Sequence, residues 1–263
     1  MEIALLAFFT AGYFVLSGAD FGIGMLLPYL GRSPEERGRV LAAITPFFLT
    51  NEVWLVAAVG FLMGAFPVLE GELLAGNYAA FTALLLGWVA RDAGIWLRGR
   101  ADRAAWRAGC DAAVVAGSWA VALSWGFVLA GSAGAPPPLL AVAVVALAGL
   151  FAVHGLALAA LRLRGGPEGR ARRPFAAAGG RTARAPAPGR TARTLAPGRT
   201  AYALTSGGMV LVCLAAGSRL PLAENLADPA TLALLTPATL VLAPLLVASQ
   251  VWLWRVLAPV RTG

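Results

Sequence analysis

Residues 3–30 read IALLAFFTAGYFVLSGADFGIGMLLPYL, an apolar run in which Asp20 is the only charged side chain. A helix needs about 20 apolar residues to cross the hydrocarbon core of a bilayer. Backbone N–H and C=O groups find no water in lipid, so an apolar run of this length is expected to be helical. The run is too long for a cleavable signal peptide and no basic residues precede it. It therefore predicts a helix that stays in the membrane.

Six further apolar runs of similar length follow this first one. They lie near 40–68, 77–97, 108–132, 137–161, 201–218 and 232–258. The whole chain is 59% hydrophobic and 13% charged with a mean hydropathy of +0.75, whereas average soluble chains carry about 25% charged residues. The sequence therefore predicts an all-α, polytopic membrane bundle of about seven transmembrane helices.

The positive charge of the chain is concentrated in one segment. The net charge is +8, but residues 162–199 alone hold ten arginines against one acid, Glu168. This distribution excludes a basic groove on a folded domain, and no nucleic-acid partner is expected. The linkers 31–39 and 98–107 are also basic, whereas the alternate linkers carry no excess of basic residues. The positive-inside rule then predicts an N-terminus outside and a C-terminus inside.

Composition divides the chain into three parts. Residues 1–163 form a first transmembrane bundle of five helices, and 201–263 form a C-terminal transmembrane pair. The segment 164–200 is rich in Arg, Pro and Gly and has almost no large apolar residue, which predicts a disordered cytoplasmic linker. Two readings of this linker are open: a contact with anionic lipid, or an insertion that only reinforces the topology. The second reading is favoured.

Several polar side chains fall inside the predicted spans, where they are costly and mark either function or a buried pair. Helix rise places most of them in the same half of the membrane, although five helices supply the ionisable ones. Arg91 is expected to pair with Asp20 or Glu52. The cluster is either a neutralised structural knot, or a proton relay or polar head of a quinone site. Its members are Asp20, Asn51, Glu52, Arg91, Asp92, Asp111, His154 and Gln250.

Cysteine and histidine are too few for a metal centre. His154 is the only histidine, and Cys110 and Cys213 lie in separate spans without metal-ligand spacing. A lone histidine in a span more often makes a packing hydrogen bond than a ligand bond, so no metal and no haem ligated by this chain are expected. Gly18, Gly22 and Gly24 give the first span a small-residue face suited to close helix packing.

Several short motifs in register resemble one family. They are Leu16–Leu26 (LSGADFGIGML), Asn51–Leu55 (NEVWL), Arg91, Arg98–Arg100, Trp106–Arg107, Asp111, Gly117–Ser118, His154–Gly155 and Gln250–Trp252. In order and spacing they are similar to subunit II of cytochrome bd-type quinol oxidases. The resemblance is good over residues 10–162 and moderate over 240–258.

This resemblance implies a non-haem accessory subunit in a bacterial plasma membrane. Its partner in the heterodimer would be the larger, haem-bearing subunit I, which holds haem b and haem d, oxidises quinol and reduces oxygen. The chain would contact membrane lipid and quinol, support assembly, and could help to form routes for protons, oxygen or a bound quinone. No catalytic residue is expected here. The resemblance points to a polar core of Asp20, Asn51, Glu52, Trp54, Arg91 and His154.

The sequence departs from the family pattern at three acidic positions. Ser17 stands where the family usually has an acid, Phe48-Leu49-Thr50 stands where it has Trp-Asp-Gly, and Trp96 replaces a Glu. The acid at the Leu49 position can take up protons in family members, and leucine can neither hold nor donate a proton. These departures put a proton channel through this chain in doubt. The chain is also shorter than usual, by about one helix before the last.

Two other functions fit the same residues. A haem-free membrane transporter would use the buried carboxylates and Arg91 to bind a substrate, but the helices show no inverted repeat. A degenerate paralogue that only stabilises a partner is favoured by the absence of the acid at Leu49.

Overall fold

The computed structural model describes residues 1–179 and 197–256, and in these ranges it is helical without a strand. Seven of the described helices are long and apolar enough to cross a membrane, which confirms the predicted all-α bundle with seven spans. The helices are α1 (Glu2–Met25), α2 (Leu27–Leu30), α3 (Pro34–Ala65), α4 (Pro67–Gly76), α5 (Tyr78–Leu97), α6 (Ala104–Ser132), α7 (Pro137–Arg162), α8 (Gly166–Gly179), α9 (Pro197–Gly217) and α10 (Pro229–Val256), with 3-10 turns η1 (Arg98–Arg100) and η2 (Leu222–Glu224).

Local sequence explains where two of the long helices begin. Ser33 precedes α3, its Oγ accepts a hydrogen bond from Glu36 N at 3.2 Å, and Pro34 occupies the first helical position. At α10, Asp228 Oδ1 accepts from the backbone N–H groups of Ala230 and Thr231, both at 3.0 Å. Such oxygen acceptors satisfy N–H groups that have no partner within the helix. The Thr231 hydroxyl and these N–H groups hold the pKa of Asp228 below its ordinary value.

Helix α1 lies at the centre of the bundle and packs against α3, α6, α7 and α9. Its contact with α7 depends on two glycines, because a Cβ on Gly22 would clash with the backbone oxygen of Phe151, and one on Gly155 would clash with the backbone of Gly22. A Cβ on Gly24 would likewise clash with Ser118 Oγ of α6, and one on Gly18 would press on Phe151. All three glycines predicted to be packing positions therefore lie at helix contacts.

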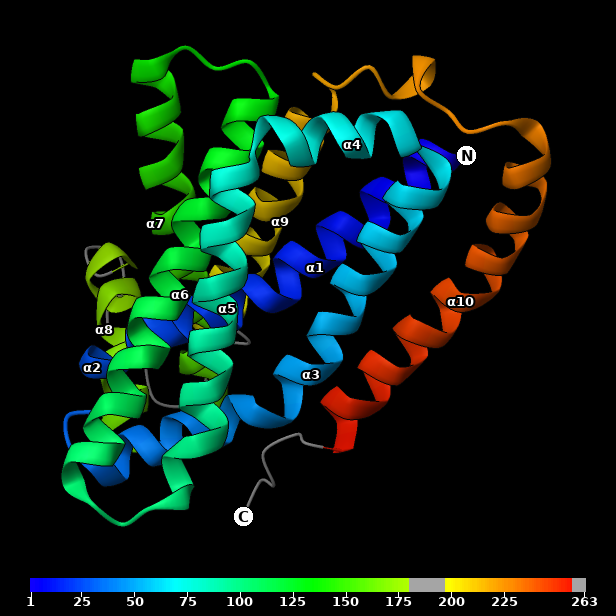
Figure 1. The fold of residues 1–263 in the computed structure, drawn as a ribbon. Coiled ribbons are helices and arrows are strands. Elements are labelled where there is room, and N and C mark those ends of the chain that lie inside the picture. The colour runs from blue at the N-terminus through cyan, green and yellow to red at the C-terminus, as the bar shows by residue number, and fades with distance from the viewer. Residues whose placement is uncertain (180–196, 257–263) are drawn as a thin grey trace.

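The two ends of the bundle differ. Figure 1 shows α4 lying across the end that holds the N-terminus, and α3 running along the opposite end before it rises beside α1. Pro46 lies inside α3, and an internal proline removes a helix hydrogen bond and favours such a bend. The basic segments meet at this opposite end, where Arg98 Nη2 donates to Pro34 O at 2.8 Å and Arg170 Nη2 donates to Leu30 O at 2.7 Å.

The structure differs from the prediction of a disordered linker over 164–200. Helix α8 occupies Gly166–Gly179 and packs against α7, α2 and α9. Arg170 accounts for this order, since it hydrogen-bonds Leu30 O and forms an ion pair with Glu36. Ala171 is fully buried beside it. Residues 180–196 of the same segment lie outside the described residues.

Helices α9 and α10, grouped by sequence as a C-terminal pair, contact different parts of the bundle. Helix α9 packs against α1 and α7, whereas α10 packs against α3. Figure 1 shows α10 along the outer side of α3, with α9 behind α4 and α5. The two helices also meet each other, since the rings of Tyr202 and Trp254 lie 6.0 Å apart between centroids.

Candidate functional site

A chain of three buried polar side chains connects α1, α3 and α10. Gln250 Nε2 donates to Asn51 Oδ1 at 2.9 Å, and Asn51 Nδ2 donates to Asp20 Oδ2 at 2.6 Å. All three side chains are buried. The asparagine therefore acts as donor and acceptor at once, and it orients the Asp20 carboxylate in an apolar surrounding.

A second group lies between α3 and α5. Trp88 Nε1 donates to Glu52 Oε1 at 2.8 Å, and Arg91 Nη1 donates to Asp92 Oδ1 at 2.8 Å. The expected ion pair of Arg91 with Asp20 or Glu52 is wrong, because its ion pair in the described residues is with Asp92. Asp92 is the next residue in the sequence. The Arg91 side chain is buried in the bundle, whereas Asp92 lies half-buried at the edge of the bundle and reaches the guanidinium from there.

Two aromatic rings also contact the Arg91 guanidinium. It is 1% exposed, and its Cζ lies 4.7 Å from the ring centroid of Phe21 and 5.5 Å from that of Phe48. Such cation–π contacts offset part of the cost of burial. Among the described residues, Nε and Nη2 of Arg91 have no hydrogen-bond partner, and the same holds for Ser17 Oγ, Asp20 Oδ1 and Gln250 Oε1. Buried polar atoms of this kind are the usual partners of internal water.

His154 joins α7 to α1 and α9. Its Nε2 lies 2.8 Å from Val15 O and its Nδ1 lies 2.6 Å from Thr205 Oγ1, while its ring stacks on Tyr202 at 4.6 Å between centroids. A carbonyl can only accept, so Nε2 carries a proton. Both ring nitrogens are thereby engaged in bonds between helices.

The structure separates two predicted residues from this polar group. Trp54 is buried among aromatic rings, 5.3 Å from Phe8 and 6.3 Å from Phe9 between centroids, so it belongs to the apolar core. Asp111 lies at the arginine-bearing end, where Arg98 Nε donates to its Oδ1 at 2.6 Å and Arg37 Nη1 lies 3.5 Å from its Oδ2. Asp20, Asn51, Glu52 and His154 lie in polar contacts between helices. Arg91 forms its ion pair within α5 and meets α1 and α3 through the Phe21 and Phe48 rings.

Three partners in these contacts were not among the predicted site residues. Trp88 lies one helical turn before Asp92, on the helix that carries Arg91, so helical spacing could have indicated it. Thr205 and Tyr202 lie one turn apart on α9. Nothing in the sequence connects that helix to His154, because the contact arises only from tertiary packing.

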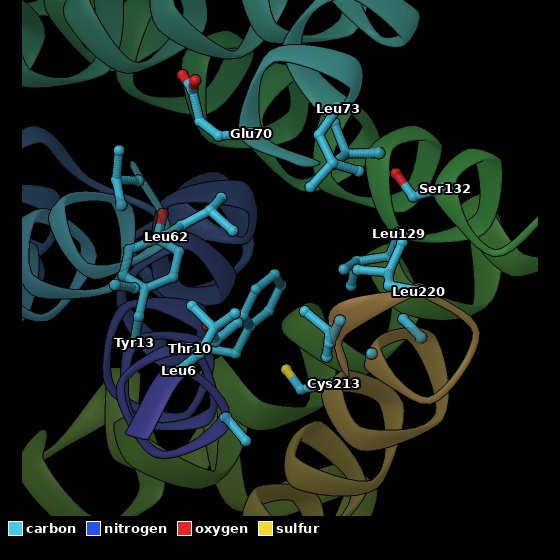
Figure 2. Close-up of a pocket in the computed structure, with 18 of the residues that line it drawn as sticks. Leu6, Thr10, Tyr13, Leu62, Glu70, Leu73, Leu129, Ser132, Cys213 and Leu220 are labelled. Carbon is cyan, nitrogen blue, oxygen red and sulfur yellow. The ribbon is translucent and has the colours of Figure 1, made fainter. Parts of the chain in front are cut away.

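An apolar cavity of about 650 Å³ lies among α1, α3, α4, α5, α6 and α9. In Figure 2, Leu6, Thr10 and Tyr13 of α1 form one side, Leu129 and Leu220 face them, and Glu70 and Leu73 of α4 lie at one end. The Cys213 sulfur points into the same space. The α3 wall includes Leu55, which lies one turn from Asn51 and Glu52. The cavity therefore ends within a helical turn of the polar network.

The residues present do not fit a haem bound by this chain. Both nitrogens of its one histidine are hydrogen-bonded to other helices. In the described ranges no three His, Cys, Asp or Glu side chains gather as a metal-binding group. The cavity of Figure 2, by contrast, has the volume and the apolar lining that are typical of small-molecule sites.

Comparisons with known proteins identify the same family that the sequence motifs in the spans resemble. The chain is 37% identical over 102 residues to cytochrome bd ubiquinol oxidase subunit 2 of Bacillus subtilis (strain 168), covering 39% of this chain and 30% of that protein. It is 33% identical over 108 residues to cytochrome bd-I ubiquinol oxidase subunit 2 of Escherichia coli (strain K12), covering 41% and 28%. The probable cytochrome oxidase subunit 2 of Haemophilus influenzae is 32% identical over 115 residues, covering 44% and 30%.

These alignments span about 30% of the length of each curated relative. A family-level match is longer and covers residues 1–187, from α1 through α8 and beyond. Because that match includes well over half of the chain, it establishes the family: the chain belongs to the cytochrome bd terminal oxidase subunit II family.

Proposed function

We propose that this chain is the haem-free accessory subunit of a bd-type quinol:oxygen oxidoreductase in a bacterial plasma membrane, and that it supports a haem-bearing subunit I. The observation that carries the proposal is the position of His154, whose two ring nitrogens bond Val15 O and Thr205. With its one histidine bonded in this way, the chain contributes packing and polar contacts to the complex, and haem b and haem d belong to the partner.

The buried network has a place in this function. Asp20 Oδ1, Ser17 Oγ and two guanidinium nitrogens of Arg91 have no partner among the described residues, so internal water would complete their hydrogen bonds. Water between Asp20 and Arg91 would let the network hold and move protons. A path that begins at Leu49 is not part of this proposal, because that side chain is an exposed leucine on α3.

The apolar cavity is proposed to hold the tail of a quinone. Its lining is apolar apart from a few side chains such as Thr10, Tyr13 and Glu70, and an isoprenoid tail needs such a surface. Cys213 provides a reporter, since its thiol lines the cavity while Cys110 packs elsewhere on α6. In a Cys110→Ala variant, decylubiquinone is expected to slow labelling of Cys213 by N-ethylmaleimide. In the matched Cys213→Ala variant, labelling of Cys110 should not change; equal effects at both thiols would contradict a quinone in this cavity.

Purification of the tagged chain from its native membrane tests the function itself. We expect a larger subunit to accompany it, with the absorption spectrum of haem d and quinol-dependent oxygen uptake. A preparation that is stable, free of haem and able to move a solute would contradict the proposal and favour a transporter. A preparation that retains a partner without haem would point to a degenerate paralogue.

A further inference from the structure

Two acidic side chains lie at the edge of the bundle within apolar spans. Glu52 of α3 and Asp92 of α5 are both half-buried. Helix rise places Glu52 about 20 Å from the end of α3 at Ala65, and Asp92 about 8 Å from the end of α5 at Leu97. Neither carboxylate therefore lies at a helix end, where water would solvate it.

The surface around these acids is apolar and exposed. We call it the α3–α5 face, and it consists of Leu49, Val53, Val56 and Met63 of α3 with Leu85, Leu86 and Val89 of α5. The α3 members recur every three to seven residues, which places them along one side of the helix. Phe48 and Trp96, whose ring centroids are 6.0 Å apart, connect the two helices below Glu52 and Trp88.

Other outward surfaces of the bundle differ from this face. Exposed residues of α7 include Leu139, Val142 and Val145, and no charged side chain occurs in α7 before Arg162 except the buried His154. Helix α10 exposes Leu234, Val241 and Leu245 and carries no charged side chain before Arg255. Surfaces of this kind suit lipid, whereas the α3–α5 face adds two carboxylates to its apolar residues.

The charges on this face do not balance. Arg91 forms an ion pair with Asp92, and Glu52 accepts a hydrogen bond from the uncharged indole of Trp88. One positive guanidinium is therefore present for two carboxylates. A half-exposed carboxylate in hydrocarbon is costly unless a donor or a cation meets it. A proton shared between Glu52 and Asp92 is the other way to remove the charge, and it would let lipid cover the face.

We propose that the α3–α5 face is the docking surface for the partner subunit, through a transmembrane helix that presents a cationic or other hydrogen-bond donor side chain to Glu52 and Asp92. This inference rests on the proposed heterodimer. The apolar residues supply the packing area of the contact, and the donor completes the hydrogen bonds of the two carboxylates.

Photo-crosslinking in the purified complex tests the surface. Benzoylphenylalanine is placed singly at Val56 and Val89 on the α3–α5 face, and at Val142 and Val145 on α7 as matched controls. All four valines are between 65% and 70% exposed, so accessibility does not distinguish them. We expect crosslinks to the partner from positions 56 and 89 and none from 142 and 145. Crosslinks from the α7 positions, or only to lipid from positions 56 and 89, would overturn the inference.

A pair of substitutions tests the donor. Glu52→Gln keeps an oxygen acceptor for the partner's side chain, whereas Glu52→Leu leaves that donor unpaired in the interface. We expect the Gln variant to retain the partner through detergent washing and the Leu variant to lose it several-fold. Equal retention by the two variants would mean that the carboxylates are neutralised without a donor from the partner.

The outcomes separate this inference from the proposed function. A chain that purifies without any haem-bearing partner contradicts the proposed function itself. A haem-bearing complex whose crosslinks arise from α7 leaves that function intact and overturns only the docking surface.

Discussion

At the scale of single residues, Glu52 and Trp88 form a hydrogen bond that a substitution of either residue can test. Trp88 Nε1 donates to Glu52 Oε1 at 2.8 Å, so the indole orients the carboxylate. Of the two side chains, only the carboxylate can take up and release a proton. We expect Glu52→Gln to lower quinol-dependent oxygen uptake several-fold in a complex that still assembles, because an amide accepts the same bond without taking up a proton. Oxygen consumption at equal haem d content measures this.

Trp88→Phe is the control for that prediction. It removes the indole donor and keeps the carboxylate, so uptake should fall less than in Glu52→Gln. If uptake in the Gln variant equals that of the unaltered complex, Glu52 has a packing role only.

Gly22 gives a second residue-scale prediction. A Cβ there would clash with Phe151 O across the α1–α7 contact, whereas a Cβ on Gly149 of α7 meets nothing within 4 Å. We expect Gly22→Ala to destabilise the protein by about 1–3 kcal/mol through overpacking. Gly149→Ala should be neutral or slightly stabilising, because alanine favours a helix more than glycine does. Thermal unfolding in detergent compares the two variants. Equal melting temperatures would show that α1 and α7 can move apart without loss of stability.

At the scale of elements, α10 depends on a small number of polar contacts. Gln250 reaches Asn51 of α3, and Thr236 Oγ1 donates to Glu2 Oε1 at 3.2 Å. Asn51→Leu removes both amide bonds of the Asp20–Asn51–Gln250 chain and leaves buried groups without partners. We expect a loss of about 1–3 kcal/mol and a faster attack by protease at the C-terminal end of α10.

Thr50→Val is the matched control, since residue 50 lies beside Asn51 on α3 and its side chain takes no part in that chain of bonds. Limited proteolysis and thermal melting should leave it unchanged. An Asn51→Leu variant that behaves like the Thr50→Val control would show that apolar packing alone holds α10 on α3.

Elements differ in how far the sequence could predict them. The seven spans followed from apolar length, because lipid requires a helix wherever such a run crosses it. Helix α8 could not be predicted in this way. Its glycines and prolines disfavour a helix. Its order comes from Arg170, which contacts Leu30 O and Glu36, residues far away in the sequence.

At the scale of the whole molecule, the polar residues were predictable and their partners were not. Spans that are apolar on every side give no periodic signal for which face turns inward. The family resemblance places Trp54 in the polar core, and no periodic signal in the sequence shows that its ring packs on Phe8 and Phe9 instead. Arg91 was expected to pair across helices, but its rotation into the bundle leaves Asp92 as its ion-pair partner. Only the packed bundle determines these pairings.

The orientation of the whole bundle gives the last prediction. The basic linkers meet at one end, where Arg98 contacts Pro34 O and Arg170 contacts Leu30 O. The positive-inside rule predicts that this end is cytoplasmic. When both native cysteines, Cys110 and Cys213, are replaced by alanine, a single cysteine in a loop reports its side of the membrane. We expect Ala135→Cys to react with a membrane-impermeant maleimide in intact spheroplasts, and Gly99→Cys to react only after permeabilisation. The reverse pattern would invert the proposed topology and would place the N-terminus and α4 on the cytoplasmic side.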